Sequence, residues 1–297
     1  MTEPAPGRPE TLAKGVRRIL APNPGPMTHW GTNTYLLGES KIAVIDPGPE
    51  SHPHLKAILA ATEGQTISHI LVTHAHADHS PLSRALAKAT GAPIYGFGGP
   101  DAGRSATMQQ LAEAGLAGGG EGVDHLFRPD VEFREGDELT TEDWRITALH
   151  TPGHFAGHLA FRCGSHLFSG DHVMDWSSSL VSPPDGDIGA FMESSERLKA
   201  LKDVTFLPGH GQPIHQAAQR LDWLIGHRRA RETAILDALG NGPLMIEALT
   251  ARVYTDTPQK MLAAAARNVF AHLIDLVERN IVQANPSLSV SAAFEIV

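Results

Sequence analysis

The chain has 297 residues, with 24 Lys and Arg against 33 Asp and Glu, so its formal net charge is −9. This length predicts one large domain with a smaller one appended, and the acidic balance argues against a broad nucleic-acid surface, which needs clustered basic side chains. Cys163 is the only cysteine, which excludes an intramolecular disulfide and a cysteine-based zinc cage. The first residues lack the apolar core of a signal peptide and no long apolar run occurs, so we expect a cytoplasmic protein without membrane contact.

The first two thirds of the chain alternate short apolar runs with helical patterns. We expect strands at residues 31–38, 41–45, 67–72, 145–149, 159–163, 166–169 and 204–207, and helices at 54–61 and 81–90. This alternation is typical of an α/β domain. Residues 96–130 interrupt it with two Gly-rich stretches around a short helical pattern at 106–114. This insertion is either a cover for a cleft or a solvated surface excursion.

The pattern changes after Gln216. Three helical patterns follow, with a short closing strand at the end, at residues 220–239, 244–253, 258–279 and 294–297. Three helices with a small β element resemble a winged-helix module. We therefore predict a catalytic domain over residues 1–216 and a winged-helix-like domain over residues 217–297.

The strongest chemical signal is the run His74-Ala-His76-Ala-Asp78-His79, which directly follows an expected strand. Imidazole and carboxylate are preferred ligands of zinc and related ions. In an extended turn, side chains two residues apart point the same way, so His74 and His76 can hold one ion. Asp78 and His79 then turn toward a second ion.

Further ligands must come from other strand ends. His154, Asp171 and His210 are candidates, because each follows or lies near an expected strand and stands close to glycines that let the backbone bend sharply. Each alone is equally well a surface turn residue. Together with the first motif they complete two coordination shells.

These residues carry a family resemblance. Asp46, the 74–79 cluster, His154, Asp171 and His210, in this order, resemble the five motifs of the metallo-β-lactamase superfamily. The resemblance covers roughly residues 16–216 and implies a four-layer αββα sandwich with the metal ions at one sheet edge.

The resemblance also implies residue roles. The first ion would be held by His74, His76 and His154, and the second by Asp78, His79 and His210, with Asp171 bridging. Asp46 would orient the ligands, and His158 would do likewise or be a plain structural histidine. The implied cofactors are two zinc ions per chain, with iron or manganese as alternatives.

Two adjacent ions can bind one water and lower its pKa, so that the resulting hydroxide attacks a carbonyl or a phosphorus. Asp78 and Asp171 would be the catalytic carboxylates of such a site. Asp171 at the bridging position and Cys163 outside the motifs argue against β-lactam hydrolysis as the main activity. A carboxylate at the bridging position is instead the pattern of glyoxalase II, lactonases and RNA-processing nucleases, which this sequence resembles in that respect.

The C-terminal patterns at residues 227–232 and 264–273 look like the tail of the lactamase-beta-two-like family, which includes an RNA nuclease. We therefore keep three hypotheses. The favoured one is a hydrolase of a small thioester, ester or lactone. The alternatives are a nuclease of single-stranded RNA and a winged-helix binding protein with a vestigial hydrolase domain.

Charge separates these hypotheses in part. Residues 217–297 carry eight basic and eight acidic side chains, whereas a nucleic-acid module is normally basic. Arg228, Arg229 and Arg231 could touch phosphate, but their helical spacing also suits a solvated face. Trp30 and Trp176 could line a substrate pocket or be ordinary partly buried residues. A homodimer is common in the family and is a further expectation.

Overall fold

The computed structural model describes residues 3–118 and 122–297. Its larger sheet has seven strands in the order β1 to β7, of which the first four run antiparallel and the rest parallel. The strands are β1 (Pro9–Ala13), β2 (Val16–Leu20), β3 (Asn33–Leu37), β4 (Lys41–Ile45), β5 (Thr66–Leu71), β6 (Ile94–Gly96) and β7 (Val131–Glu132).

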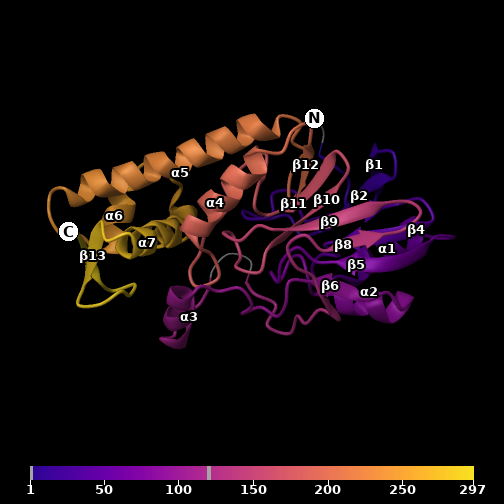
Figure 1. The fold of residues 1–297 in the computed structure, drawn as a ribbon, viewed down its shortest axis with the longest axis horizontal. Coiled ribbons are helices and arrows are strands. Elements are labelled where there is room, and N and C mark those ends of the chain that lie inside the picture. The colour runs from indigo at the N-terminus through magenta and orange to yellow at the C-terminus, as the bar shows by residue number, and fades with distance from the viewer. Residues whose placement is uncertain (1–2, 119–121) are drawn as a thin grey trace.

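The second sheet has five strands in the order β12-β11-β10-β9-β8, and only β11 and β12 run parallel. These strands are β8 (Glu138–Thr140), β9 (Arg145–His150), β10 (Leu159–Cys163), β11 (His166–Gly170) and β12 (Thr205–Pro208). The two sheets pack face to face (Figure 1). Tyr35 from the first sheet meets Phe168 from the second edge-on, with ring centroids 5.2 Å apart.

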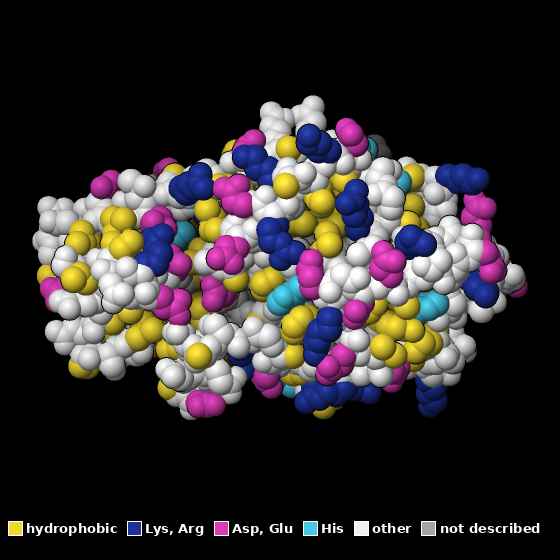
Figure 2. All heavy atoms as spheres, viewed as in Figure 1, with side chains coloured by type: hydrophobic (Ala, Val, Ile, Leu, Met, Phe, Trp, Pro, Cys, Tyr) yellow, Lys and Arg dark blue, Asp and Glu magenta, His cyan; other side chains and the backbone are white. Residues whose placement is uncertain are grey.

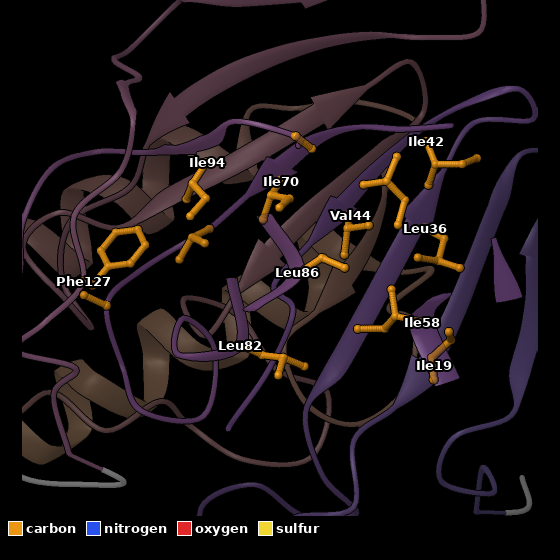
Figure 3. Close-up of a cluster of buried hydrophobic side chains, with 14 of the residues drawn as sticks. Ile19, Leu36, Ile42, Val44, Ile58, Ile70, Leu82, Leu86, Ile94 and Phe127 are labelled. Carbon is orange, nitrogen blue, oxygen red and sulfur yellow. The ribbon is translucent and has the colours of Figure 1, made fainter. Parts of the chain in front are cut away.

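Helices α1 (His52–Ala61) and α2 (Leu82–Thr90) cover the outer face of the first sheet. Figure 3 shows Ile42, Val44 and Ile70 of this sheet among side chains from the two helices, Ile58, Leu82 and Leu86. The burial of these apolar side chains holds the helices to the sheet. The Ser51 side chain caps α1 by accepting the N–H of His54, and α2 ends at Gly91 in the left-handed conformation.

Helix α4 (Ile188–Lys199) and the first half of α5 (Ala217–Leu239) cover the outer face of the second sheet. Leu198, Leu221 and Leu224 of these helices pack on Ala160 and Phe206 of the sheet. The order of layers is therefore helices, sheet, sheet, helices, which confirms the predicted αββα sandwich.

The second half of α5 leads into a separate cluster at one end of the molecule (Figure 1). It contains α6 (Ile246–Val253), the 3-10 turn η1 (Gln259–Met261), α7 (Leu262–Glu278) and the hairpin of β13 (Val282–Asn285) and β14 (Ala293–Ile296). Three helices followed by a hairpin confirm the predicted winged-helix arrangement. Within the described ranges, no helix is both long and apolar enough to cross a membrane.

Candidate metal centre

The predicted ligands lie in loops that follow strands of both sheets. Asp46 follows β4 and the 74–79 loop follows β5, while Asp171 follows β11 and His210 follows β12. His154 lies four residues beyond β9. The carboxyl ends of these strands meet at one edge of the sandwich, where α/β folds place their ligands. The fold therefore brings the distant motifs together.

Three imidazoles form the first group. His74 Nε2 lies 2.9 Å from His76 Nδ1, and His154 Nε2 lies 3.1 Å from the same atom. All three side chains are buried. Burial first, and the neighbouring imidazoles second, lower the pKa of His76 to about 3 and hold the pKa of His74 well below its ordinary value. These histidines are neutral near pH 7, which is the form that binds metal ions.

Two imidazoles and two carboxylates form the second group. His210 Nε2 lies 3.1 Å from Asp78 Oδ2 and 3.3 Å from Asp171 Oδ2, and His79 Nε2 lies 3.4 Å from an oxygen of each. The four ligand atoms lie within 4.8 Å of one another. Asp171 Oδ2 is also 3.8 Å from His154 Nε2, so this carboxylate spans both groups.

The carboxylates of the second group attract positive charge. Burial opposes ionisation of Asp171, but His210 and His79 outweigh it and hold the pKa of that carboxyl well below its ordinary value. Burial likewise opposes the charged form of His210, yet Asp171 and Asp78 raise its pKa to about 10. Asp78 Oδ1 and Asp171 Oδ1 are buried without a hydrogen-bond partner among the residues that the structure describes. Buried unpaired carboxylate oxygens beside imidazoles fit a divalent cation.

The two predicted supporting residues contact the ligands directly. Asp46 Oδ2 lies 2.9 Å from His79 Nδ1, so the other ring nitrogen of His79 faces the second group. His158 Nε2 accepts the backbone N–H of Asp171 at 3.3 Å, and its Nδ1 lies 2.8 Å from Thr151 Oγ1. Both contacts hold a predicted ligand residue in place.

A cavity opens beside the two groups and reaches His76, Asp78, His154 and Asp171. Its other walls come from three places: the loop of Pro26 and Met27, the loop from Met174 to Leu180, and the C-terminal domain. The last wall escaped sequence analysis and comprises Tyr254, Thr257, Met261, Ala264, Ala265 and Asn268. Ala264, Ala265 and Asn268 of α7 thus line the cavity.

The two tryptophans predicted as pocket residues differ in their position relative to the cavity. Trp176 lines the cavity. Trp30 is not among the described residues that line the cavity. The ring of His29 stacks on Trp30 at 4.3 Å and on Trp176 at 4.8 Å between ring centroids. Trp30 contacts Trp176 through His29, and its role at a substrate site stays a prediction.

The insertion at residues 96–130 has a structural role. Its helix α3 (Ala106–Glu113) packs Met108 and Leu111 into the core of the C-terminal domain. The N–H of Asp124 donates to the carbonyl of Ala75, next to the first ligands. Of the described residues of this segment, 96–118 and 122–130, none lines the cavity.

A sandwich with clustered imidazoles and carboxylates at strand ends defines a class of hydrolases with a metal site. The chain belongs to the metallo-β-lactamase superfamily, whose family model matches residues 27–210. A second model, the beta-lactamase associated winged helix domain, matches residues 246–289.

Individual proteins resemble the chain over most of its length. The "Beta-lactamase-like protein 2 homolog" of Drosophila melanogaster is 33% identical and covers 89% of this chain and 88% of its own. An "Atrochrysone carboxyl ACP thioesterase" of Claviceps purpurea is 26% identical over 88% of this chain and 79% of its own. The crystal structure of a beta-lactamase domain protein from Burkholderia ambifaria superposes with a TM-score of 0.80 at 22% identity, over 100% of this chain and 95% of its own.

Proposed function

We propose that this protein is a hydrolase with two zinc ions that cleaves a small thioester, ester or lactone with an uncharged, apolar acyl part. Three features support the proposal: the two ligand groups, the carboxylate of Asp171 between them, and the apolar cavity beside them.

We assign the predicted ligand roles to the two groups. His74, His76 and His154 would hold one ion, and Asp78, His79 and His210 the other, with Asp171 shared. Bound divalent cations supply Lewis-acid chemistry and lower the pKa of water. The chain contributes geometry: Asp46 orients His79, and the backbone carbonyl of Leu180 orients His154 through Nδ1 at 2.6 Å.

The single observation that favours an acyl substrate is the character of the cavity wall. Apart from the ligands themselves, the described wall residues carry no formal charge and include Met27, Met174, Trp176, Leu180 and Met261. A phosphodiester backbone is bound by Lys and Arg, and neither lines this cavity among the described residues. Apolar walls with a few polar groups are typical of small-molecule sites.

Two further observations agree with this choice. On the face that Figure 2 shows, basic and acidic side chains are interspersed, without the continuous basic track that binds nucleic acid. The Claviceps purpurea relative is named as a thioesterase of an acyl carrier protein. Thioesters therefore come first among the substrates to be tested.

The test is a substrate panel on protein of measured metal content. It contains a glutathione thioester, a thioester with an aromatic acyl group, a homoserine lactone, a chromogenic β-lactam, bis-p-nitrophenyl phosphate and labelled single-stranded RNA. We expect turnover of acyl substrates that disappears in His74→Ala and persists in His52→Ala, whose side chain is exposed at the start of α1. Cleavage of RNA or the phosphodiester without acyl turnover would overturn the choice of substrate, and protein without stoichiometric metal would overturn the metal assignment.

A further inference from the structure

We propose that Arg228 and Asn268, from the C-terminal helices α5 and α7, are positioning residues for the metal ligand His154. They clamp the backbone segment 179–181, and the carbonyl in the middle of that segment orients the His154 ring. The inference rests on the proposed metal centre and adds a second task for the C-terminal domain, besides walling the cavity.

The contact between the segment and the ligand is short and specific. His154 Nδ1 lies 2.6 Å from the carbonyl oxygen of Leu180, and a carbonyl only accepts, so Nδ1 carries the proton. The lone pair of Nε2 is then free, and this atom faces His76 Nδ1 at 3.1 Å. The position of one backbone carbonyl thus selects the tautomer and the orientation of a ligand.

The residues on either side of Leu180 are held from the C-terminal domain. Arg228 Nη2 donates to the carbonyl of Ser179, on one side. On the other side, the N–H of Val181 donates to Asn268 Oδ1 at 3.1 Å. Arg228 Nη1 donates to the same Asn268 oxygen at 3.0 Å, so the two clamping side chains are joined.

The burial of Arg228 shows that this contact is not incidental. Its side chain is 1% exposed, which corrects the expectation that it lies on a solvated or phosphate-binding face. Burying a guanidinium costs free energy unless hydrogen bonds and favourable contacts replace water. Here those partners are Ser179, Asn268 and the ring of Phe191, whose centroid lies 5.2 Å from the guanidinium carbon.

The same segment also reaches the shared carboxylate residue. Ser179 Oγ donates to the backbone carbonyl of Asp171 and contacts that of His172 at 3.1 Å. Residues 179 and 180 therefore touch one member of each ligand group. Displacing the segment should loosen His154 first. The segment contacts the imidazole ring of His154, whereas it contacts only the backbone carbonyl of Asp171.

The test compares the Arg228→Met variant with two other variants on the same helix. Arg228→Lys keeps one donor for Ser179, and Arg229→Gln removes an exposed arginine that pairs with Glu196. Each metal-free protein is titrated with zinc against a chromogenic chelator. Long-range proton–nitrogen NMR of histidine-labelled metal-free protein reports which nitrogen of His154 carries the proton.

We expect Arg228→Met to bind one of its two zinc ions about 10- to 100-fold more weakly and to lose the pure Nδ1–H signature of His154. The zinc affinity of Arg228→Lys should lie between those of Arg228→Met and the wild type, and Arg229→Gln should match the wild type in both measurements. A folded Arg228→Met protein with wild-type zinc affinity and an unchanged tautomer overturns the inference. If this variant does not fold, Asn268→Ala decides by the same two measurements.

Zinc-binding measurements distinguish a wrong metal centre from a wrong assignment of Arg228 and Asn268. Wild-type protein that binds no zinc contradicts the metal centre itself. Wild-type protein that binds two ions, with folded clamp variants that bind them equally well, contradicts the clamp alone.

Discussion

His79 Nδ1 and Asp46 Oδ2 lie 2.9 Å apart, and both side chains are buried. Asp46 also accepts the backbone N–H and the hydroxyl of Thr73, each at 2.8 Å. The carboxylate is therefore fixed by the loop that carries the first ligands. Its own backbone has a φ of 50°, an uncommon value for a residue other than glycine. A constrained position of this kind holds the ring of His79 toward the second ligand group.

Asp46→Asn should weaken binding of the second metal ion by about 10- to 100-fold. Both carboxylate oxygens of Asp46 act as acceptors, Oδ1 from the Thr73 N–H and Oδ2 from the Thr73 hydroxyl and the His79 ring. An amide puts an NH2 group in place of one of these oxygens, so at least one of these donors then faces another donor. Zinc stoichiometry and affinity, measured by chelator competition, check this. Asp143→Asn is the matched control, because Asp143 accepts the N–H groups of Ser40 and Lys41 at the opposite ends of the strands. Equal metal binding by the Asp46 and Asp143 variants would contradict the assigned role.

Gly209→Ala should abolish binding at the second group while the protein remains folded. A methyl group at this position would lie 2.3 Å from Asp171 Oδ1 and 2.7 Å from His79 Cε1, so both ligands must move. Gly226→Ala on α5 is the control, since its methyl would meet nothing within 4 Å and alanine favours a helix by about 0.5–1 kcal/mol. Metal analysis and thermal unfolding separate the outcomes. Two tightly bound ions in the Gly209 variant would show that the ligand geometry tolerates the displacement.

Ala264→Leu should lower kcat/KM for a thioester with a bulky acyl group by about tenfold or more, with a smaller effect on an acetyl thioester. The added methyl groups enter the cavity from α7, next to Met261. Ala263→Leu, at the neighbouring exposed position, should leave both substrates unaffected. The ratio of the two kcat/KM values is the measurement, with metal content determined in parallel. A ratio that moves equally in both variants would remove Ala264 from the substrate site.

His272→Gln should reduce the loss of stability in acid. Burial first, and Arg228 second, lower the pKa of His272 to about 3 in the folded protein. The unfolded chain takes up this proton near pH 6.5, so the folded state is disfavoured by about 1.4 kcal/mol for each pH unit below that value, down to about pH 3. Above pH 6.5 this residue gives no pH dependence.

Chemical denaturation at pH 7.5 and pH 4.5 checks the histidine prediction. The difference in unfolding free energy between the two pH values should be about 2–3 kcal/mol smaller in His272→Gln than in the wild type. His52→Gln, altered at an exposed position, should keep the wild-type difference. An unchanged difference in the His272 variant would mean that its ring is protonated in the folded protein.

Some elements escaped prediction because their sequences carry weak local signals. Strand β7 has two residues, both exposed, and β8 has three residues with none buried. They are strands because their neighbours β6 and β9 supply hydrogen-bond partners. Strand β4 was predictable, since the continuous apolar run Ile42–Ile45 indicates burial on both faces. Strand β5 was predictable from its apolar residues Ile67, Ile70 and Leu71 next to the histidine motif. The proposed division near residue 217 stays a prediction, although α5 begins at Ala217 and runs from one core into the other.

The order of motifs, the candidate ligands and the type of the long, strongly patterned elements were readable from the chain alone. His74, His76, Asp78 and His79 lie within six residues of one loop, and helical periodicity depends only on near neighbours. The substrate wall and the support of His154 were decided by tertiary packing. Arg228 and Ser179 are 49 residues apart, and they meet only because α5 crosses from the sandwich to the C-terminal domain. No local pattern distinguishes such an arginine from one in solvent, because its burial depends on what the rest of the fold places against it.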